Sequence, residues 1–199
     1  MTPSDTTPAA HAAHASGRFD PLARTLHWAM ALMILAMLFV GAGMVASLSG
    51  RPWLLDLHRP LGIAILVLAV LRLVHRLRHP PPPLPASLPR WQQWAAHASH
   101  WLLYGLMLAM PLLGWAMLSA AGDPVRMAGD WVLPPIAVQD PALYAALRWA
   151  HGALGYALFA TILVHVSAAL RHAWVLRDGV FQAMAPVATG VDRDAPAPP

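Results

Sequence analysis

The sequence predicts an all-α membrane protein whose four transmembrane helices form an up-down-up-down bundle. Composition is the first reason, because the chain has 199 residues, of which 58% are hydrophobic and only 11% are charged. Soluble domains carry about 25% charged residues. The second reason is a series of four apolar runs, each long enough to cross the ~30 Å hydrocarbon layer of a bilayer. Short connections between successive runs favour antiparallel neighbours.

The first two helices are expected between residue 20 and a basic stretch near residue 79. Asp20 and Pro21 combine an N-cap acid with a proline in the first helical turn. The run 26–48 that follows contains no charged residue. After a short loop, Asp56 is expected to cap a second helix, whose main apolar part is 61–74.

The third and fourth helices follow a proline-rich break at 80–89, which cannot be helical. We expect the third helix at 91–121, kinked at Pro111, as membrane bundles tolerate. Asp140 and the proline after it repeat the N-cap device and begin a fourth helix that extends to about Arg177.

The two ends of the chain differ in composition from the helical region. Residues 1–18 are rich in Ala, Thr, Pro and Ser and lack the apolar region of a signal peptide. Residues 187–199 are rich in Ala and Pro. We therefore expect two disordered tails around one folded unit at 19–186.

Charge and cysteine usage narrow the function classes. The chain has no Cys, which excludes disulfides, thiolate-held iron–sulfur clusters and covalently attached c-type haem. The formal net charge is +4, and the basic residues flank apolar spans, which favours membrane orientation over nucleic-acid binding. The lipid bilayer is thus the first predicted partner.

Arginine is distributed unequally between the two sides of the predicted bundle. One side carries Arg18, Arg24, Arg72, Arg76, Arg78, Arg90, Arg171, Arg177 and Arg193, and the other carries Arg51, Arg59, Arg126 and Arg148. The positive-inside rule therefore places both termini and the basic loop in the cytoplasm.

Four of the eleven histidines fall at two matched depths of the bundle. His27 and His165 lie near the cytoplasmic ends of the first and fourth helices, and His58 and His151 lie near the outer ends of the second and fourth. The two on the fourth helix are about 21 Å apart along its axis and leave nearly the same face. Two imidazoles on facing helices are how a bundle holds a b-type haem. The pattern predicts two haems b, with these four histidines as axial ligands of the iron.

Other interpretations of the four histidines fit less well. A single His in an apolar helix is more often packed than a ligand, but two matched pairs favour ligation. Zinc would need more than two histidines per site. A proton-relay transporter would carry Asp or Glu inside its spans, and the predicted spans contain none.

Further polar residues fall at the cytoplasmic depth. Arg72 lies fourteen residues after His58 on a similar face, where a haem propionate would neutralise it. His97 and His100, one turn apart on the third helix, are candidates for a propionate bond, a quinone pocket or a replacement ligand, or are plain interfacial histidines. His172 is a similar candidate. Tryptophans beside these residues would flank a quinone ring.

Several motifs of the sequence resemble the bacterial cytochrome b561 family, di-haem cytochromes grouped with the cytochrome b subunits of nickel–iron hydrogenases. The resemblance covers roughly 18–186. The matching pieces are Leu26-His27-Trp28, His58 with Gly62, Arg72 to Arg76 before the proline-rich loop, His97 and His100 with Tyr104, Trp149-Ala150-His151 with Leu154-Gly155-Tyr156, His165, and Arg177-Asp178-Gly179 to Met184-Ala185-Pro186. The resemblance implies the same four haem ligands, cytoplasmic termini and a place in the bacterial inner membrane.

The resemblance also implies a function. Similar proteins oxidise superoxide at the periplasmic face and pass electrons to ubiquinone. The outer arginines would then attract superoxide, unless neighbouring aspartates simply balance them. The alternative is a haem-bearing anchor subunit of a larger dehydrogenase or hydrogenase, with a redox partner protein. No catalytic side chain is assigned from the sequence.

Overall fold

The structure, a computed structural model, describes residues 17–85, 88–127 and 131–185. It contains four long helices, α1 (Pro21–Ala46), α2 (Arg51–Arg78), α3 (Arg90–Ala121) and α4 (Pro141–Arg171). All four are apolar and long enough to cross a membrane, which confirms the predicted fold class. The predicted tails at 1–18 and 187–199 lie outside the described residues, apart from residues 17 and 18.

The helices begin where local chemistry stabilises their first turns. The Asp20 carboxylate accepts a hydrogen bond from the Ala23 N–H at 2.9 Å, and the Asp140 carboxylate accepts one from Leu143 at 2.6 Å. Both predicted N-caps are confirmed. The prediction that Asp56 caps the second helix was wrong, because α2 already begins at Arg51 after Gly50, with a proline in its first turn. Asp56 therefore lies inside α2.

The fourth helical segment ends with Arg177 as its C-cap, as the sequence predicted, but its last turn is not α-helical. Helix α4 ends at Arg171 and continues as one π-helical turn, His172–Leu176. Arg177 then adopts the left-handed conformation with φ 51°, and Gly179 follows with φ 84°. This reversal starts a short helix, α5 (Val180–Met184), which sequence periodicity did not reveal because it is only five residues long.

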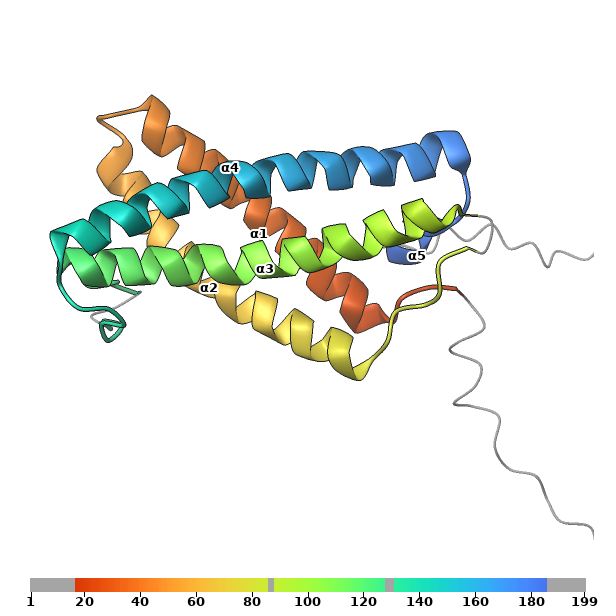
Figure 1. Cartoon of the computed structure of the whole chain (residues 1–199), viewed down its shortest axis with the longest axis horizontal. Coiled ribbons are helices and arrows are strands. Elements are labelled where there is room, and N and C mark those ends of the chain that lie inside the picture. Colours follow the sequence, from red (N-terminus) through yellow and green to blue (C-terminus); the bar gives the residue numbers. More distant parts are fainter. Residues whose placement is uncertain (1–16, 86–87, 128–130, 186–199) are drawn as a thin grey trace, which may run out of the picture.

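Two helical hairpins form the bundle, and they cross each other in Figure 1. Helix α1 packs along α2, α3 packs along α4, and the contact of α2 with α3 joins the hairpins. The core lies among α1, α2 and α3 and consists of Met30, Ile34, Ile65, Ala69, Tyr104 and Met107. Within the described chain, α4 makes few close backbone contacts with α1 or α2, and Leu158 is its one buried residue.

The two ends of the bundle carry different connections between the helices. The terminal face holds the start of α1, the end of α2, the start of α3 and the end of α4, and the loop face is the opposite end. At the terminal face, α5 is tied to the start of α1. The Trp28 indole N–H donates to the Met184 carbonyl at 2.9 Å, and the Phe19 N–H donates to the Ala183 carbonyl at 3.1 Å.

Candidate functional site

His58 of α2 and His151 of α4 face each other near the loop face. Their ring centroids are 6.1 Å apart, with an angle of 68° between the ring planes. The Nδ1 atom of each ring is buried and has no hydrogen-bond partner. The two rings share a pocket with mostly apolar side chains, contributed by Ile34, Met37, Leu38, Gly62, Ile65, Met107, Met110, Pro111 and Leu158. A buried polar nitrogen without a partner costs free energy. We therefore expect these two rings to bind a ligand.

His27 of α1 and His165 of α4 face each other near the terminal face. Their ring centroids are 6.4 Å apart, with an angle of 59° between the planes. A third imidazole, His100 of α3, lies 5.6 Å from the His165 ring. The Arg72 guanidinium donates to Nδ1 of His27 at 2.7 Å, so this nitrogen is the acceptor. The four histidines thus form the two juxtapositions that the sequence predicted by depth, and their role as ligands stays a prediction.

The geometry of both pairs fits a metal held between two imidazoles. Two imidazoles that bind one metal ion from opposite sides, each through a nitrogen about 2 Å from it, have ring centroids about 6 Å apart. Each pair also joins α4 to α1 or α2, helices with which α4 makes few other close contacts. No cluster of three or more His, Asp or Glu side chains in the described residues suits a bare metal ion. The pairs therefore fit a metal that brings its own equatorial ligands, as a porphyrin does.

Glycines bring neighbouring groups close to the His58/His151 pair. A Cβ on Gly114 of α3 would lie 3.3 Å from Cε1 of His151, so the absence of a side chain lets this ring pack against α3. A Cβ on Gly62 would meet the methyl carbon of Met37 at 3.7 Å, and one on Gly155 would meet that of Met110 at 3.6 Å. These glycines thus let neighbouring side chains approach the helix backbone closely around this pocket.

The other predicted site residues are dispersed over the terminal face. His100 joins the His27/His165 pair, whereas His97 is exposed on α3. His172 lies in the π-helical turn, where its Nδ1 is 2.7 Å from the Asp178 carboxylate, and this ion pair is largely shielded from solvent. The structure therefore brings one of the three candidate quinone ligands to a histidine pair and ties another to an acid.

One of the outer arginines that were expected to attract anions, Arg59, is paired with an acid. Arg59 forms an ion pair with Asp123, which follows α3. Arg148 lies near the Tyr144 hydroxyl, with 3.4 Å between donor and acceptor. Neutralisation by aspartate, the second interpretation of these arginines, applies to Arg59.

A polar cluster at the terminal face was not predicted from the sequence. Nε2 of His75 lies 3.0 and 3.1 Å from the two carboxylate oxygens of Asp20, and the His75 ring stacks on His79 at 4.3 Å between centroids. Burial raises the pKa of Asp20, but the bonds from Ala23 and His75 outweigh it and hold the pKa below its ordinary value. The signal available in the sequence was the i, i+4 spacing of the two histidines.

A four-span bundle with two facing histidine pairs that share one helix defines the class of membrane b-type cytochromes. Comparison with known proteins gives the family. Residues 18–186 match the family described as prokaryotic cytochrome b561, and the chain belongs to this family. It is therefore a haem b-binding electron-transfer protein of a prokaryotic inner membrane, crossing the membrane several times.

Individual relatives cover nearly the same length. The chain is 32% identical over 166 residues to a protein named probable superoxide oxidase CybB of Yersinia pestis, covering 83% of this chain and 94% of that protein. It is 28% identical over 172 residues to cytochrome b561 homolog 2 of Escherichia coli K12, covering 84% and 90%. It is 29% identical over 184 residues to homolog 1 of the same strain, covering 85% and 97%.

Proposed function

We propose that this chain is a membrane oxidoreductase with two haems b that oxidises superoxide at one face of the membrane and reduces ubiquinone at the other. The observation that carries the proposal is the presence of one facing histidine pair near each end of the bundle. The name of the Yersinia pestis relative supports superoxide as the donor. Electrons balance when two superoxide ions give two dioxygen molecules and one quinone takes up two electrons and two protons.

In this proposal His58 and His151 would hold one haem near the loop face, and His27 and His165 would hold the other near the terminal face. A bound haem supplies one-electron redox chemistry, and the protein sets its orientation and electrostatics. The separation of the His58 and His151 rings, 6.1 Å between centroids in a mostly apolar pocket, supports this assignment. Neutral imidazole is the form that binds iron.

The contact between Arg72 and His27 supports a role for Arg72 towards a haem carboxylate. An imidazole that binds a metal through one nitrogen carries a proton on the other. If His27 held the haem through Nε2, its Nδ1 would carry the proton and could not accept from Arg72. The Arg72 guanidinium would then be available to a haem propionate at the depth of the pair.

We place the quinone and the cytoplasm at the terminal face. The support is that His100 lies against the His27/His165 pair, that His97 lies one turn away on α3, and that His172 is on the adjoining turn after α4. Arginine is more frequent on this side of the bundle, which supports a cytoplasmic terminal face. Superoxide would then meet the loop face from the periplasm.

The test is to give superoxide and a water-soluble quinone to the purified protein and to record both the haem spectrum and quinol formation. We expect haem reduction and quinol formation faster than the spontaneous reaction. Rates should fall with rising salt if exposed arginines steer the anion. Haems that stay oxidised in superoxide, with a stoichiometric iron–sulfur partner after mild purification, would instead identify an anchor subunit.

A further inference from the structure

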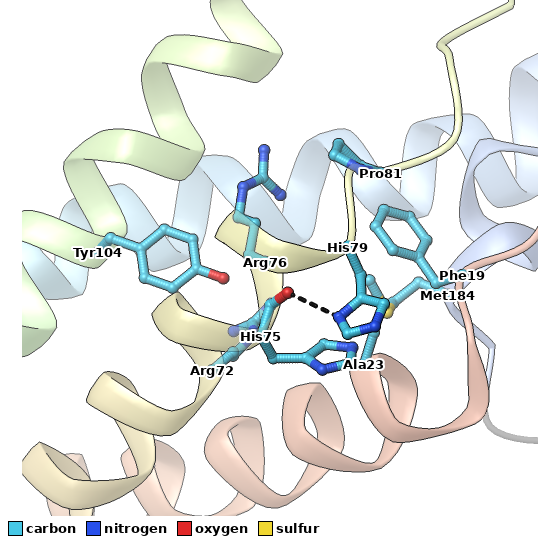
Figure 2. Close-up of a pocket in the computed structure, with 9 residues that line it drawn as sticks. All are labelled: Phe19, Ala23, Arg72, His75, Arg76, His79, Pro81, Tyr104 and Met184. Atoms are coloured by element: carbon cyan, nitrogen blue, oxygen red, sulfur yellow. Dashed lines mark hydrogen bonds between the residues drawn. The ribbon is translucent and has the colours of Figure 1, made fainter.

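A second cavity, lined by charged and aromatic side chains, lies at the terminal face between α1, α2, α3 and α5 (Figure 2). Its volume is about 30 Å³, roughly twice the minimum that one water molecule needs. The lining residues are Phe19, Ala23, Arg72, His75, Arg76, His79, Pro81, Tyr104 and Met184. A cavity of this size suits a small polar group rather than an aromatic ring.

Within the described residues, no carboxylate pairs with the two arginines of this cavity. Arg72 and Arg76 lie one turn apart on α2, where like charges repel, and neither forms an ion pair within the described part of the chain. Asp20 is the carboxylate beside this cavity, and both of its oxygens are already bonded to His75. Two guanidiniums at the end of a membrane span, without an acid partner among the described residues, form a site that favours an anion.

Tyr104 holds the two guanidiniums in place. Its buried ring lies 5.5 Å from the Arg72 guanidinium carbon and 5.8 Å from that of Arg76, so both cations face the aromatic ring. The Tyr104 hydroxyl points toward the α2 side chains in Figure 2. A hydroxyl donor and two guanidiniums are the groups that bind phosphate oxygens.

The two arginines differ in what else they contact. Arg72 reaches inward and donates to His27, which places it at the histidine pair. Arg76 lies one turn nearer the end of α2, and its guanidinium also covers the ring of Trp101 at 6.0 Å. Arg76 therefore faces the outer part of the cavity, away from His27.

The position of the cavity indicates the source of the anion. It lies where α2 reaches the end of its apolar span, and the side chains of Trp94 and Trp101 are 77% and 52% exposed nearby on α3, as expected at the headgroup level of a membrane. Phe19, Pro81 and Met184 give the cavity an apolar edge. Basic pockets between transmembrane helices at this depth bind anionic lipid headgroups.

We infer that this cavity binds the phosphate group of an anionic membrane phospholipid through Arg76 and Tyr104. This inference does not depend on superoxide or quinone as substrates. Free phosphate has the same chemistry, and haem carboxylates are the other anions at this end of the bundle, so the experiment must separate all three.

The experiment measures lipid binding to the purified, haem-loaded protein by native mass spectrometry, with haem content determined on the same samples. The probes are phosphatidylglycerol, phosphatidylcholine and inorganic phosphate. We expect binding of phosphatidylglycerol in preference to the other two, and a loss of about tenfold in affinity in Arg76→Gln with unchanged haem content. Arg78→Gln, an equal change of charge at an exposed position two residues away, should bind like the wild type.

Three results would overturn the inference. The first is equal binding of phosphatidylglycerol and phosphatidylcholine, and the second is stronger binding of inorganic phosphate than of lipid. The third is a parallel loss of haem and lipid in Arg76→Gln, which would assign Arg76 to the haem. If Arg76→Gln does not fold, Tyr104→Phe replaces it, and it should weaken phosphatidylglycerol binding while keeping the aromatic ring under both guanidiniums.

Discussion

The two histidine pairs use the same side chains in opposite surroundings. The His58/His151 pair lies among methionine, leucine, isoleucine and glycine, with both Nδ1 atoms unpartnered. The His27/His165 pair has a third imidazole beside it and a guanidinium bonded to one ring. The pair near the loop face is thus surrounded mainly by apolar side chains, whereas the pair near the terminal face has a further imidazole and a cationic guanidinium beside it.

This difference has a direct electrochemical meaning under the two-haem proposal. Reduction adds a negative charge, so a nearby guanidinium favours the reduced form; Arg72 contacts the His27/His165 pair, and no arginine lines the His58/His151 pocket. The pair at the terminal face should therefore hold the haem of higher potential. Electron transfer towards that face would be downhill, which agrees with a donor at the loop face and an acceptor at the terminal face.

The largest expected effect is the loss of a haem, and it should differ between the two ends. His58→Ala should abolish the loop-face haem, since no third imidazole contacts that pair among the described residues. His27→Ala should retain part of the terminal-face haem, because His100 lies 5.6 Å from His165 and can take the vacated position. A haem count and a reduced-minus-oxidised spectrum measure both.

The double variant His27→Ala/His100→Ala is the control for this substitution, and it should lose the terminal-face haem completely. The comparison fails if His27→Ala and His58→Ala lose equal amounts of haem. Finding one haem per chain in freshly purified wild type would remove the two-haem proposal itself.

A smaller effect is expected from the charge at the terminal face. A unit charge 8 Å away contributes about 2 kcal/mol at an effective dielectric constant of about 20, equivalent to several tens of millivolts in a one-electron couple. Arg72→Leu should therefore lower the potential of the terminal-face haem by this order and leave the other haem unchanged. Redox titration measures both, with exposed Arg78→Leu as the matched control. Equal shifts from the two variants would contradict the role of Arg72.

At the loop face, the corresponding change is steric. A Cβ on Gly114 would lie 3.3 Å from His151, so Gly114→Ala should displace the ring by a few tenths of an ångström and weaken haem binding by less than about tenfold. Gly105→Ala is the control on the same helix, because a Cβ there meets nothing within 4 Å. Haem titration of apoprotein would show whether Gly114→Ala alone weakens the loop-face site.

The smallest effect concerns the two helix caps. Asp20 and Asp140 cap α1 and α4 alike, but Asp20 also pairs with His75. Asn keeps the cap, so Asp20→Asn should cost no more than about 1 kcal/mol at pH 7, because the pair is partly exposed. Asp140→Asn should cost less.

The pH dependence of the Asp20 effect has a definite sign. Its pKa in the folded protein is below the ordinary value of 3.8, with His75 and His79 as the facing charges. The stabilisation is therefore present above that value and is lost as pH falls through the lower folded pKa. In thermal unfolding, the difference between wild type and Asp20→Asn should be constant above pH 3.8 and should shrink as the pH falls further, and a difference that does not shrink in acid would refute the pairing.

The parts of this fold that could be predicted depend on local pattern. Asp20 and Asp140 could be recognised as helix starts because an Asp side chain caps the first turn. The fourteen-residue spacing of His151 and His165 places both on one face of a helix at two different depths. The start of α2 was misjudged because Asp56 is a good cap residue that lies within a helix already begun at Arg51.

Contacts between distant segments could not be predicted in the same way. The bond from His75 to Asp20 and the ion pair of Arg59 with Asp123 depend on how hairpins and loops meet, which no periodicity encodes. Helix α5 is too short to show a pattern, yet Trp28 is bonded to its last residue. The candidate ligands could therefore be predicted from the sequence, but the charged surroundings that distinguish the His27/His165 pair from the His58/His151 pair could not.

The sparse contact of α4 with α1 and α2 has a consequence for how cells make this protein. The α1–α2 hairpin and the α3–α4 hairpin can each insert into the membrane as a unit, but helix packing alone contributes little to the docking of α4 against the first hairpin. A cofactor bound between them would supply that free energy by mass action. The amount of mature protein should then follow the haem supply of the cell, because chains that lack haem would leave α4 loosely docked and open to membrane proteases.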